Sequence, residues 1–273
     1  MTLSLAGPLL LVGAGKMGGA LLEGWLRQGL DPKSVFIQDP APSAHVEALA
    51  VRHGIAAGLA PDLPGEPSVV VIAVKPQVTD KLLPEVEPLL GEKTVVLSIA
   101  AGRTLAGLAH HLPPNTAIVR AMPNTPAAIG QGMSVAVANR SVTPEQKREC
   151  DALLAAVGEV IWIEDEMLLD AVTAVSGSGP AYVFLLAECL AEAGVQAGLD
   201  PELADRLARA TIAGAGELLR RSELTPMELR ENVTSPQGTT AAALEELMVE
   251  KGLKHLLARA VAAATKRSRE LSS

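Results

Sequence analysis

The sequence is poor in aromatic residues, with two tryptophans, one tyrosine and two phenylalanines among 273 residues. Single-stranded nucleic acids stack their bases on aromatic side chains, and this composition provides no such platform. The net charge of −8 also disfavours nucleic acid and anionic membrane surfaces. We therefore expect neither class of partner.

Cysteine is equally scarce, and Cys150 and Cys189 are far apart in the sequence. We expect both to be small buried apolar residues, because a disulfide framework or a metal site needs more ligands or closer spacing. No group of cysteine, histidine and carboxylate residues has the spacing of metal ligands, so we expect no metal. All five histidines lie outside the motifs described below. That position disfavours a hydroxy-acid dehydrogenase that uses an imidazole base.

Targeting signals are also missing from the pattern. The N-terminal segment lacks the basic region of a signal peptide and leads directly into a glycine loop. We find no apolar run long enough to span a bilayer, and we expect a cytoplasmic location. With 48% hydrophobic and 20% charged residues, the chain has the composition of a globular protein.

The first part of the chain, residues 1–163, alternates short apolar runs with helical or loop segments. Near-continuous apolar strands separated by helices indicate an α/β domain with a parallel sheet covered on both faces. The runs are PLLLVG, SVFIQ, SVVVIAV, TVVLSIA, AIVRA, MSVAVA and VIWI.

The second part, residues 164–273, has no strand pattern and predicts an all-α domain. Asp200 and Pro201 are typical of an N-cap and a first helical residue, and Thr225–Glu228 has the pattern of a capping box. The segment GPAYVFLLAECLAEAGVQAGL is apolar nearly all round, so a helix here needs burial on every side. We expect a second copy of the chain to cover it in an obligate dimer. The alternative is a central helix in a monomeric bundle.

A glycine loop, Gly13-Ala14-Gly15-Lys16-Met17-Gly18, follows the first apolar run and opens a helical pattern. In a dinucleotide-binding loop, the first glycine permits the turn and the second lets a pyrophosphate approach the backbone. The third lets helix and strand pack closely. The helix N-terminus then supplies N–H donors to phosphate. This context predicts a dinucleotide site, and a glycine turn without a ligand is the alternative.

Asp39 follows the next apolar run, 21 residues after Gly18. An acidic residue at this position accepts hydrogen bonds from the ribose hydroxyls and repels a 2′-phosphate, which favours NADH over NADPH. The Asp39-Pro40 pair is alternatively ordinary turn chemistry. No arginine is close in sequence, although Lys33 or Arg52 can approach through the fold.

Three further loops follow apolar runs, at the strand ends where open α/β sheets bind ligands. They are AVKP (Ala73–Pro76), SIAAG (Ser98–Gly102) and AMPNTP (Ala121–Pro126). Their small residues allow a flat nicotinamide to lie against the backbone, and Asn124 and Thr125 can bond its ribose or carboxamide. For Lys75 we place a structural role ahead of a catalytic one.

The motifs GAGKMG, AVKP, SIAAG, RAMPNTP, VSGSGPAYVF and SPQGTT occur in this order along the chain. In this the sequence resembles the pyrroline-5-carboxylate reductases of proline biosynthesis, over essentially its whole length. The resemblance implies a Rossmann-like dinucleotide-binding domain followed by a helical dimerisation domain. It also implies a homodimer or larger assembly that reduces 1-pyrroline-5-carboxylate to L-proline with NADPH or NADH.

The resemblance further implies which residues bind. The dinucleotide contacts the glycine loop, the AVKP loop, the SIAAG loop and an asparagine of the dimerisation domain. The substrate contacts the SPQGTT loop, and we expect the SGSGP turn to line the same pocket. The cofactor residues are Val12, Gly13, Ala14, Gly15, Lys16, Met17, Asp39, Ala73, Val74, Lys75, Pro76, Ala100, Ala101, Asn124 and Asn232, and the substrate residues are Ser178, Gly238, Thr239 and Thr240.

Two positions depart from the family pattern. Many members carry Ser or Thr, which suit a 2′-phosphate, where this chain has Asp39. Many members also have glycine in place of Gln237, and we expect this difference to have little effect because Gly238 is kept.

The segment NVTSPQGTT gathers hydroxyls, a proline and a glycine before a helical pattern. We predict Ser235 as N-cap and Pro236 as first helical residue, so that backbone N–H groups near Gly238 form an anion site. The substrate carboxylate would bind there. By resemblance, the Thr240 hydroxyl faces the ring nitrogen as catalytic group. The alternative is that these hydroxyls only bond the local backbone.

Two other functions stay open on the sequence. One is a β-hydroxyacid or imine reductase of the same two-domain plan that acts on another substrate. The other is a non-catalytic dinucleotide sensor, against which the second anion-binding loop argues, since a sensor has no need of one.

Overall fold

The computed structural model describes residues 2–272, so Met1 and Ser273, the outermost residues of the two predicted domains, lie outside the described part. The chain forms two compact units. The first contains the chain up to Gly177 and returns at Ala264, and the second spans Ser178–Ala263.

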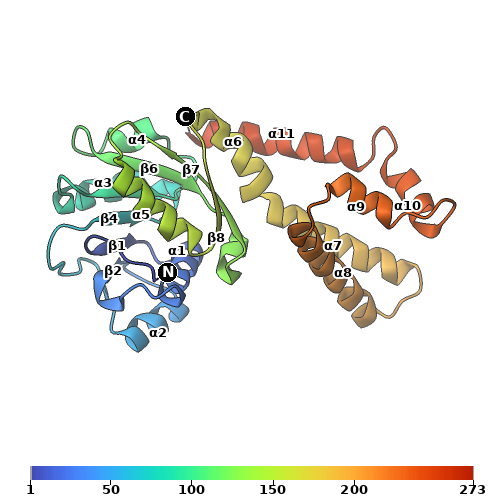
Figure 1. Ribbon diagram of the computed structural model, residues 1–273, viewed down its shortest axis with the longest axis horizontal. Coiled ribbons are helices and arrows are strands. Elements are labelled where there is room, and N and C mark those ends of the chain that lie inside the picture. The colour runs from blue at the N-terminus through green and yellow to red at the C-terminus, as the bar shows by residue number, and fades with distance from the viewer. Residues whose placement is uncertain (1, 273) are drawn as a thin grey trace. The chain divides into compact units, whose positions relative to one another are not determined.

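An eight-stranded sheet forms the centre of the first unit, in the order β3-β2-β1-β4-β5-β6-β7-β8 (Figure 1). All seven predicted runs form strands. The short edge strand β3 was not predicted, because Ala56-Ala57-Gly58 contains none of the β-branched or aromatic residues typical of strands. The strands are β1 (Leu9–Val12), β2 (Val35–Gln38), β3 (Ala56–Gly58), β4 (Val69–Ile72), β5 (Val95–Ser98), β6 (Ala117–Met122), β7 (Gly132–Ala138) and β8 (Gly158–Trp162).

The sheet is parallel except where β7 pairs antiparallel with β6. The expectation of a wholly parallel sheet was therefore wrong at this pair. The reason is the connection, which holds only the short 3₁₀ helix η3 (Thr125–Ile129). A parallel crossover needs a dozen residues or more, whereas a short link returns the chain beside the strand it has just left.

Helices cover both faces of the sheet. The central strands are apolar on both faces, so each face needs such a cover. On one face, Leu9 and Leu11 pack with α1 (Lys16–Arg27), α2 (Ala44–His53) and α5 (Pro144–Ala155). On the other face, Leu10 and Val12 pack with α3 (Pro76–Val86) and α4 (Leu105–Ala109). The α/β fold predicted for this part is confirmed. Short 3₁₀ turns η1 (Pro32–Ser34) and η2 (Glu87–Leu89) complete the connections.

The core on the first face includes Trp25 and Cys150, both fully buried. The indole N–H of Trp25 donates to the carbonyl oxygen of Leu153 at 2.9 Å, which joins α1 to α5. Burial raises the pKa of the Cys150 thiol, and this residue is the buried apolar cysteine expected. Cys189 is exposed on the described chain, so the expectation of burial was wrong there.

The first unit continues beyond residue 163, where the predicted first domain ends, through η4 (Glu166–Leu168), α6 (Leu169–Val172) and the π-helical turn η5 (Thr173–Gly177). Leu169 is buried with Val135 and Val137 of β7, which explains why this segment stays with the sheet. The end of α11 (Leu253–Ser272) also returns here, since the Ser268 hydroxyl donates to Asp170 at 2.6 Å.

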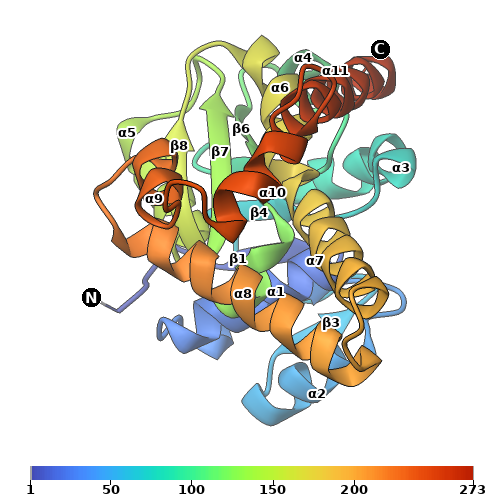
Figure 2. The ribbon, with the colours of Figure 1, turned by 90° about the vertical axis from the view of Figure 1, so that its right-hand side faces the viewer.

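The second unit contains helices and no strand among the described residues, as predicted (Figure 2). Asp200 accepts hydrogen bonds from the first turn of α8, and Thr225 and Glu228 form the predicted capping box. The helices are α7 (Gly179–Gln196), α8 (Pro201–Arg221), α9 (Pro226–Asn232), α10 (Thr239–Leu247) and the first part of α11.

Helix α7 buries none of its residues within the described chain. Phe184 is 65% exposed and Leu185 is 57% exposed, as are neighbouring leucines of α7 and α8 to similar degrees. Large apolar side chains exposed together on two neighbouring helices are a feature of interaction sites rather than of free solvent-facing helices.

The expectation that the chain has no apolar run long enough to span a bilayer was wrong in the segment that contains α7. The helical stretch Glu166–Gln196 has 31 residues and is, by length and composition alone, apolar enough to cross a membrane. The sequence had been expected to contain no such run. The core helices of soluble proteins can have the same length and composition.

Candidate active site

The carboxyl ends of neighbouring parallel strands bring the predicted dinucleotide motifs of the first unit together. Strands β2, β1, β4, β5 and β6 lie side by side and parallel. The motif residues follow their ends directly, with Gly13 after β1, Asp39 after β2 and Ala73 after β4. Strand order reverses between β1 and β4, and open α/β sheets bind ligands at this switch point.

The three glycines of the loop meet different surroundings. Gly13 has φ +90°, and a Cβ added there would lie 2.6 Å from Cγ1 of Val74. A Cβ at Gly18 would overlap the carbonyl oxygen of Gly13. Gly15 has no atom within 4 Å of the added Cβ. Internal packing thus requires Gly13 and Gly18, whereas the space over Gly15 fits a pyrophosphate that approaches the backbone.

Helix α1 opens at this loop without a capping side chain and without an acidic residue in its first turn. Its N-terminal N–H groups therefore keep their positive potential for an anion. A cavity of about 430 Å³ lies against the loop. The residues that line it include Gly15, Lys16, Met17, Gly19, Ser43, His45, Val46 and Thr125.

Asp39 bonds the glycine loop itself. Its Oδ2 accepts the N–H of Ala14 at 2.6 Å, and its Oδ1 accepts the N–H of Ala41 at 2.8 Å. The carboxylate is therefore held at the end of β2, where a ribose reader is expected. Both proposed functions of Asp39, turn chemistry and ribose recognition, are compatible with this geometry.

Lys33 and Arg52 are the two cations considered for a 2′-phosphate, and neither is adjacent to Asp39 in the chain. Lys33 precedes β2, so the strand separates it from Asp39 by about 13 Å. Arg52 lies in the last turn of α2, which begins at Ala44 and runs about 15 Å. Its neighbours Val51 and Gly54 line one cavity with Asp39.

The AVKP loop opens α3, with Lys75 as N-cap and Pro76 in the first turn, and no side chain caps it. Arg103, which follows the SIAAG loop, donates from Nε and Nη2 to the Pro76 carbonyl oxygen at 3.2 and 2.9 Å. Sequence reasoning missed Arg103, since only its position directly after SIAAG connects it with the site.

A second link was also missed. Arg120 of β6 is buried, and its Nη1 donates to Oε1 of Glu166 at 2.7 Å. The same oxygen accepts the N–H of Leu105, the first residue of α4, at 2.7 Å. Arg120 stood in the quoted motif RAMPNTP, but nothing in the sequence indicated a partner 46 residues further on.

The amide oxygen and the amide nitrogen of the Asn124 side chain both form hydrogen bonds within the first unit. Its Oδ1 accepts the N–H of Met133 at 2.9 Å, and its Nδ2 donates to the carbonyl and hydroxyl oxygens of Ser176 at 3.3 Å each. The side chain thus fastens the η3 turn to β7 and to the segment before α7. Thr125, beside it, lines the cavity at the glycine loop.

In the second unit, the SPQGTT loop begins its helix later than predicted. Gly238 is the N-cap and α10 begins at Thr239, so the prediction of Ser235 and Pro236 at these positions was wrong. The Gly238 N–H donates to the Ser235 carbonyl at 3.0 Å, which closes a turn in place of a helical start. Gln237 adopts φ +59° in this turn, a conformation that favours glycine.

This helix start has the features of an anion site. No side chain caps α10 and no acidic residue lies in its first turn. Helical geometry leaves the N–H groups of Thr239, Thr240 and Ala241 without intrahelical acceptors. Thr240 is half-buried and Thr239 exposed, and Asn232 is the exposed last residue of α9.

Ser178, the last predicted substrate residue, stands as N-cap of α7 with no side-chain capping bond. The π-helical turn η5 runs directly into this helix, and Ser178 itself has helical φ and ψ of −86° and −22°. Its side chain is half-buried.

Most helices that open from the predicted ligand motifs have no capping side chain. These are α1, α3, η3, α7 and α10. The exception is α4, which follows the SIAAG loop and is capped by Thr104. Of the helices that follow none of these motifs, α2, α5, α8 and α9 are capped, by Ser43, Thr143, Asp200 and Thr225, and α6 is uncapped.

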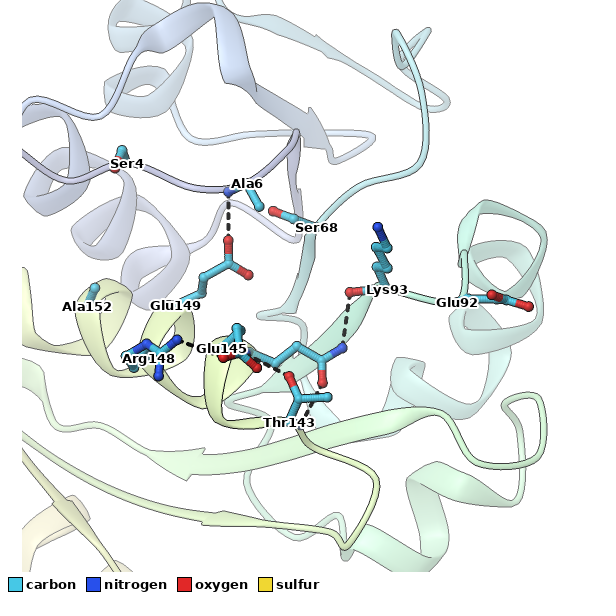
Figure 3. A pocket seen from close by; sticks show the side chains of 11 residues that line it. Ser4, Ala6, Ser68, Glu92, Lys93, Thr143, Glu145, Arg148, Glu149 and Ala152 are labelled. Carbon is cyan, nitrogen blue, oxygen red and sulfur yellow. Dashed lines mark hydrogen bonds and ion pairs between the residues drawn. The ribbon is translucent and has the colours of Figure 1, made fainter.

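A separate cavity of about 590 Å³ lies at the amino ends of the strands and contains none of the predicted residues (Figure 3). There Gln146 donates to the Lys93 carbonyl at 3.0 Å, and Glu149 accepts the Ala6 N–H at 2.7 Å. Its polar groups are thus bonded largely to one another. Among residues 2–272, no three His, Cys, Asp or Glu side chains are grouped so that they could hold a metal ion.

Two family models match the chain. Residues 166–271 match the model described as pyrroline-5-carboxylate reductase dimerisation. Residues 9–102 match the model described as NADP oxidoreductase, coenzyme F420-dependent. The first covers the second unit with its exposed apolar helices, and the second covers the glycine, AVKP and SIAAG loops.

Individual relatives match nearly the whole chain. A pyrroline-5-carboxylate reductase of Pseudomonas aeruginosa is 40% identical over 96% of this chain and 95% of its own length. The structure of such a reductase from Coxiella burnetii has a TM-score of 0.90 at 33% identity, over 98% of this chain and all of that one. The pyrroline carboxylate reductase of Plasmodium falciparum with NADP bound has a TM-score of 0.82 at 29% identity, over 98% and 99%. Since the similarity runs through both units, the chain belongs to the pyrroline-5-carboxylate reductase family.

Proposed function

We propose that this chain reduces 1-pyrroline-5-carboxylate to L-proline, the last step of proline biosynthesis, as a cytoplasmic enzyme. The nicotinamide of NADH or NADPH supplies a hydride to the imine carbon. The chain's own residues must hold an anionic ring, orient it and provide a hydrogen bond at the ring nitrogen. Proximity and orientation supply most of the acceleration, because a protonated imine is already electrophilic.

The observation that carries this proposal is the uncapped start of α10. Its N-terminal N–H groups and helix dipole form a preorganised site for a carboxylate without an arginine. Such a site, in addition to the glycine loop of the first unit, fits an enzyme that binds two anionic ligands. Because the helix starts at Thr239, its free N–H donors are those of Thr239, Thr240 and Ala241, and Gly238 is the N-cap.

Each predicted substrate residue then has a specific role. The closed turn at Gly238 places the helix start, and the N–H groups of Thr239 and Thr240 bind the carboxylate. The Thr240 hydroxyl bonds the ring nitrogen and either helps to protonate it or holds it as the iminium. Ser178, whose hydroxyl caps no helix, contributes a further polar contact to the substrate.

The dinucleotide is held by the loops at the strand ends. The open space over Gly15 receives the pyrophosphate, and the uncapped first turns of α1 and α3 face phosphate and ribose. Asn124 acts by fixing the η3 turn, and Asn232 is a further residue that we propose contacts the dinucleotide. The remaining contacts come from Val12, Gly13, Ala14, Lys16, Met17, Ala73, Val74, Lys75, Pro76, Ala100 and Ala101.

NADH is the cofactor that the geometry favours. Asp39 is fixed at the end of β2 by two backbone N–H groups, from Ala14 and Ala41. Its carboxylate would repel a 2′-phosphate there.

We infer further that the enzyme is a homodimer in which the exposed faces of α7 and α8 are covered by the second copy. Apolar residues such as Phe184 and Leu185 are half or more exposed on the single chain, and the family model of this segment is a dimerisation model.

Reduction of pyrroline-5-carboxylate, followed by loss of nicotinamide absorbance with NADH and NADPH in parallel, should show a higher kcat/KM for NADH. Asp39→Ser should shift that ratio towards NADPH by roughly tenfold or more, because it removes the charge that repels a 2′-phosphate. A wild-type preference for NADPH would restrict Asp39 to its bonds with Ala14 and Ala41. Absence of turnover with either cofactor would contradict the proposed reaction.

The two substitutions Gly15→Ala and Gly18→Ala should separate ligand binding from folding. The Gly15 methyl meets no protein atom, so stability should stay within about 0.5 kcal/mol while dinucleotide affinity falls at least about tenfold. The Gly18 methyl overlaps the Gly13 carbonyl, so the free energy of unfolding should drop by about 1–3 kcal/mol. Calorimetric titration measures the dinucleotide affinity, and chemical denaturation measures the free energy of unfolding. Unchanged affinity in Gly15→Ala would refute the pyrophosphate assignment.

Thr240→Val should lower kcat by about tenfold or more, because a positioned proton donor contributes at least this much, while dinucleotide affinity stays unchanged. Thr240→Ser keeps the hydroxyl and should retain most of the activity. Thr116→Val removes a hydroxyl that bonds only the Pro113 carbonyl, and it serves as the matched control. Wild-type turnover in Thr240→Val would remove Thr240 from the mechanism.

Sedimentation at micromolar concentration should find a dimer or larger assembly and no folded monomer. Phe184→Glu should weaken the assembly, because it places a charge where an apolar contact is expected. A folded wild-type monomer under these conditions would overturn the assignment of α7 and α8 as an interface.

A further inference from the structure

Arg103 joins two of the loops that follow the central strands. It lies directly after the SIAAG loop, and its side chain is 28% exposed. Its Nε and Nη2 both donate to the carbonyl oxygen of Pro76 in the AVKP loop, at 3.2 and 2.9 Å. Its Nη2 also pairs with Oδ2 of Asp80 in α3 at 2.8 Å. A planar guanidinium with several donors fixes both direction and distance, which a lysine does not.

The loop that Arg103 holds is in contact with the glycine loop. A Cβ on Gly13 would lie 2.6 Å from Cγ1 of Val74 and 2.9 Å from the Ala73 carbonyl carbon. The backbone at Ala73 and Val74 therefore lies directly against the turn after β1. A displacement at Pro76, two residues further along, changes the room available at that turn.

The other side of Arg103 is also fixed. Two residues later, the N–H of Leu105 donates to Oε1 of Glu166, which in turn pairs with the buried Arg120. The segment that carries Arg103 is thus attached to β6 and η4, and its side chain reaches from this support to Pro76. A side chain with an anchored backbone loses less conformational entropy when it forms such bonds.

We propose that Arg103 is a positioning residue for the dinucleotide, which sets the AVKP loop against the glycine loop in the conformation that binds. The proposal rests on the proposed function, in which both loops contact the dinucleotide. Arg103 acts through the Pro76 carbonyl, so it should govern cofactor affinity and leave the chemical step unaffected.

Asp80 has a secondary part in this arrangement. Its side chain is 43% exposed, and solvent screens an ion pair of this kind. The bonds to Pro76 are independent of the carboxylate charge. Loss of the Asp80 charge should therefore have a smaller effect than loss of the guanidinium.

The test is the dissociation constant for NADH, or for NADPH if that is the preferred cofactor, measured by calorimetry without substrate. Arg103→Leu should raise it roughly tenfold, which is a coupling of ordinary size. Arg103→Lys keeps the charge but loses the paired guanidinium donors, and it should raise the dissociation constant about threefold. Asp80→Asn should raise the dissociation constant by less than that. Arg148→Leu removes an exposed ion pair with Glu145 on α5 and should change nothing.

Kinetics supply the readout that a purely structural role would not give. In Arg103→Leu, KM for the cofactor should rise while kcat at saturation and KM for pyrroline-5-carboxylate stay within about twofold. A dissociation constant within twofold of wild type overturns the proposal, whether or not the melting temperature falls. If Arg103→Leu does not fold, the result for Arg103→Lys decides in the same way. Because binding is measured without substrate, a failure of the reductase reaction is distinguishable from a failure of this proposal.

Discussion

The close approach of backbone to backbone between β1, α1 and the loop after β4 is the constraint on which the dinucleotide region depends. Gly13 lies against Val74, and Gly18 against the carbonyl of Gly13, so neither position has room for a side chain. This approach brings the first turn of α1 beside the loop after β4, where the order of the strands reverses. The N–H groups that we propose bind phosphate and the Asp39 carboxylate that we propose reads the ribose then lie at the same end of the strands, because all the strands concerned are parallel.

Much of this arrangement was predictable from local pattern, and the misses have physical causes. Apolar runs identified seven strands and the glycine spacing identified the loop, because burial on both faces and turn geometry leave direct marks on sequence. Strand β3 was missed since an edge strand of Ala and Gly carries no such mark. Arg103 and the Arg120–Glu166 pair were missed because their partners are distant in sequence. The start of α10 was misplaced because Ser235 and Pro236 have good capping chemistry, yet Gln237 turns the chain through a positive φ first.

The second unit combines an apolar helical sequence with an exposed helix surface. Its longest apolar helix, α7, buries no residue within the single chain, although the helix pattern predicted burial on every side. A stretch that satisfies the length and composition of a membrane span is thus explained equally by a partner copy, and the family of this segment is a dimerisation family. The exposure of Cys189 has the same origin, since it lies on that helix. Its burial was predicted from residue type, which carries no information on which chain supplies the cover.

Most of the predicted ligand loops lead into helices without a capping side chain, with α4 as the exception, and each missing cap costs helix stability. A serine, threonine or aspartate at an N-cap stabilises a helix by about 1 kcal/mol, and the chain uses such residues at α2, α4, α5, α8 and α9. At α1 and α10 the N-cap is glycine, and at α3 it is lysine. A capping hydroxyl or carboxylate would occupy the N–H groups that an anionic ligand needs, and a carboxylate would repel it. The same donors cannot serve both a capping side chain and a ligand, so an uncapped helix start gives up stability and keeps its N–H groups available to an anion.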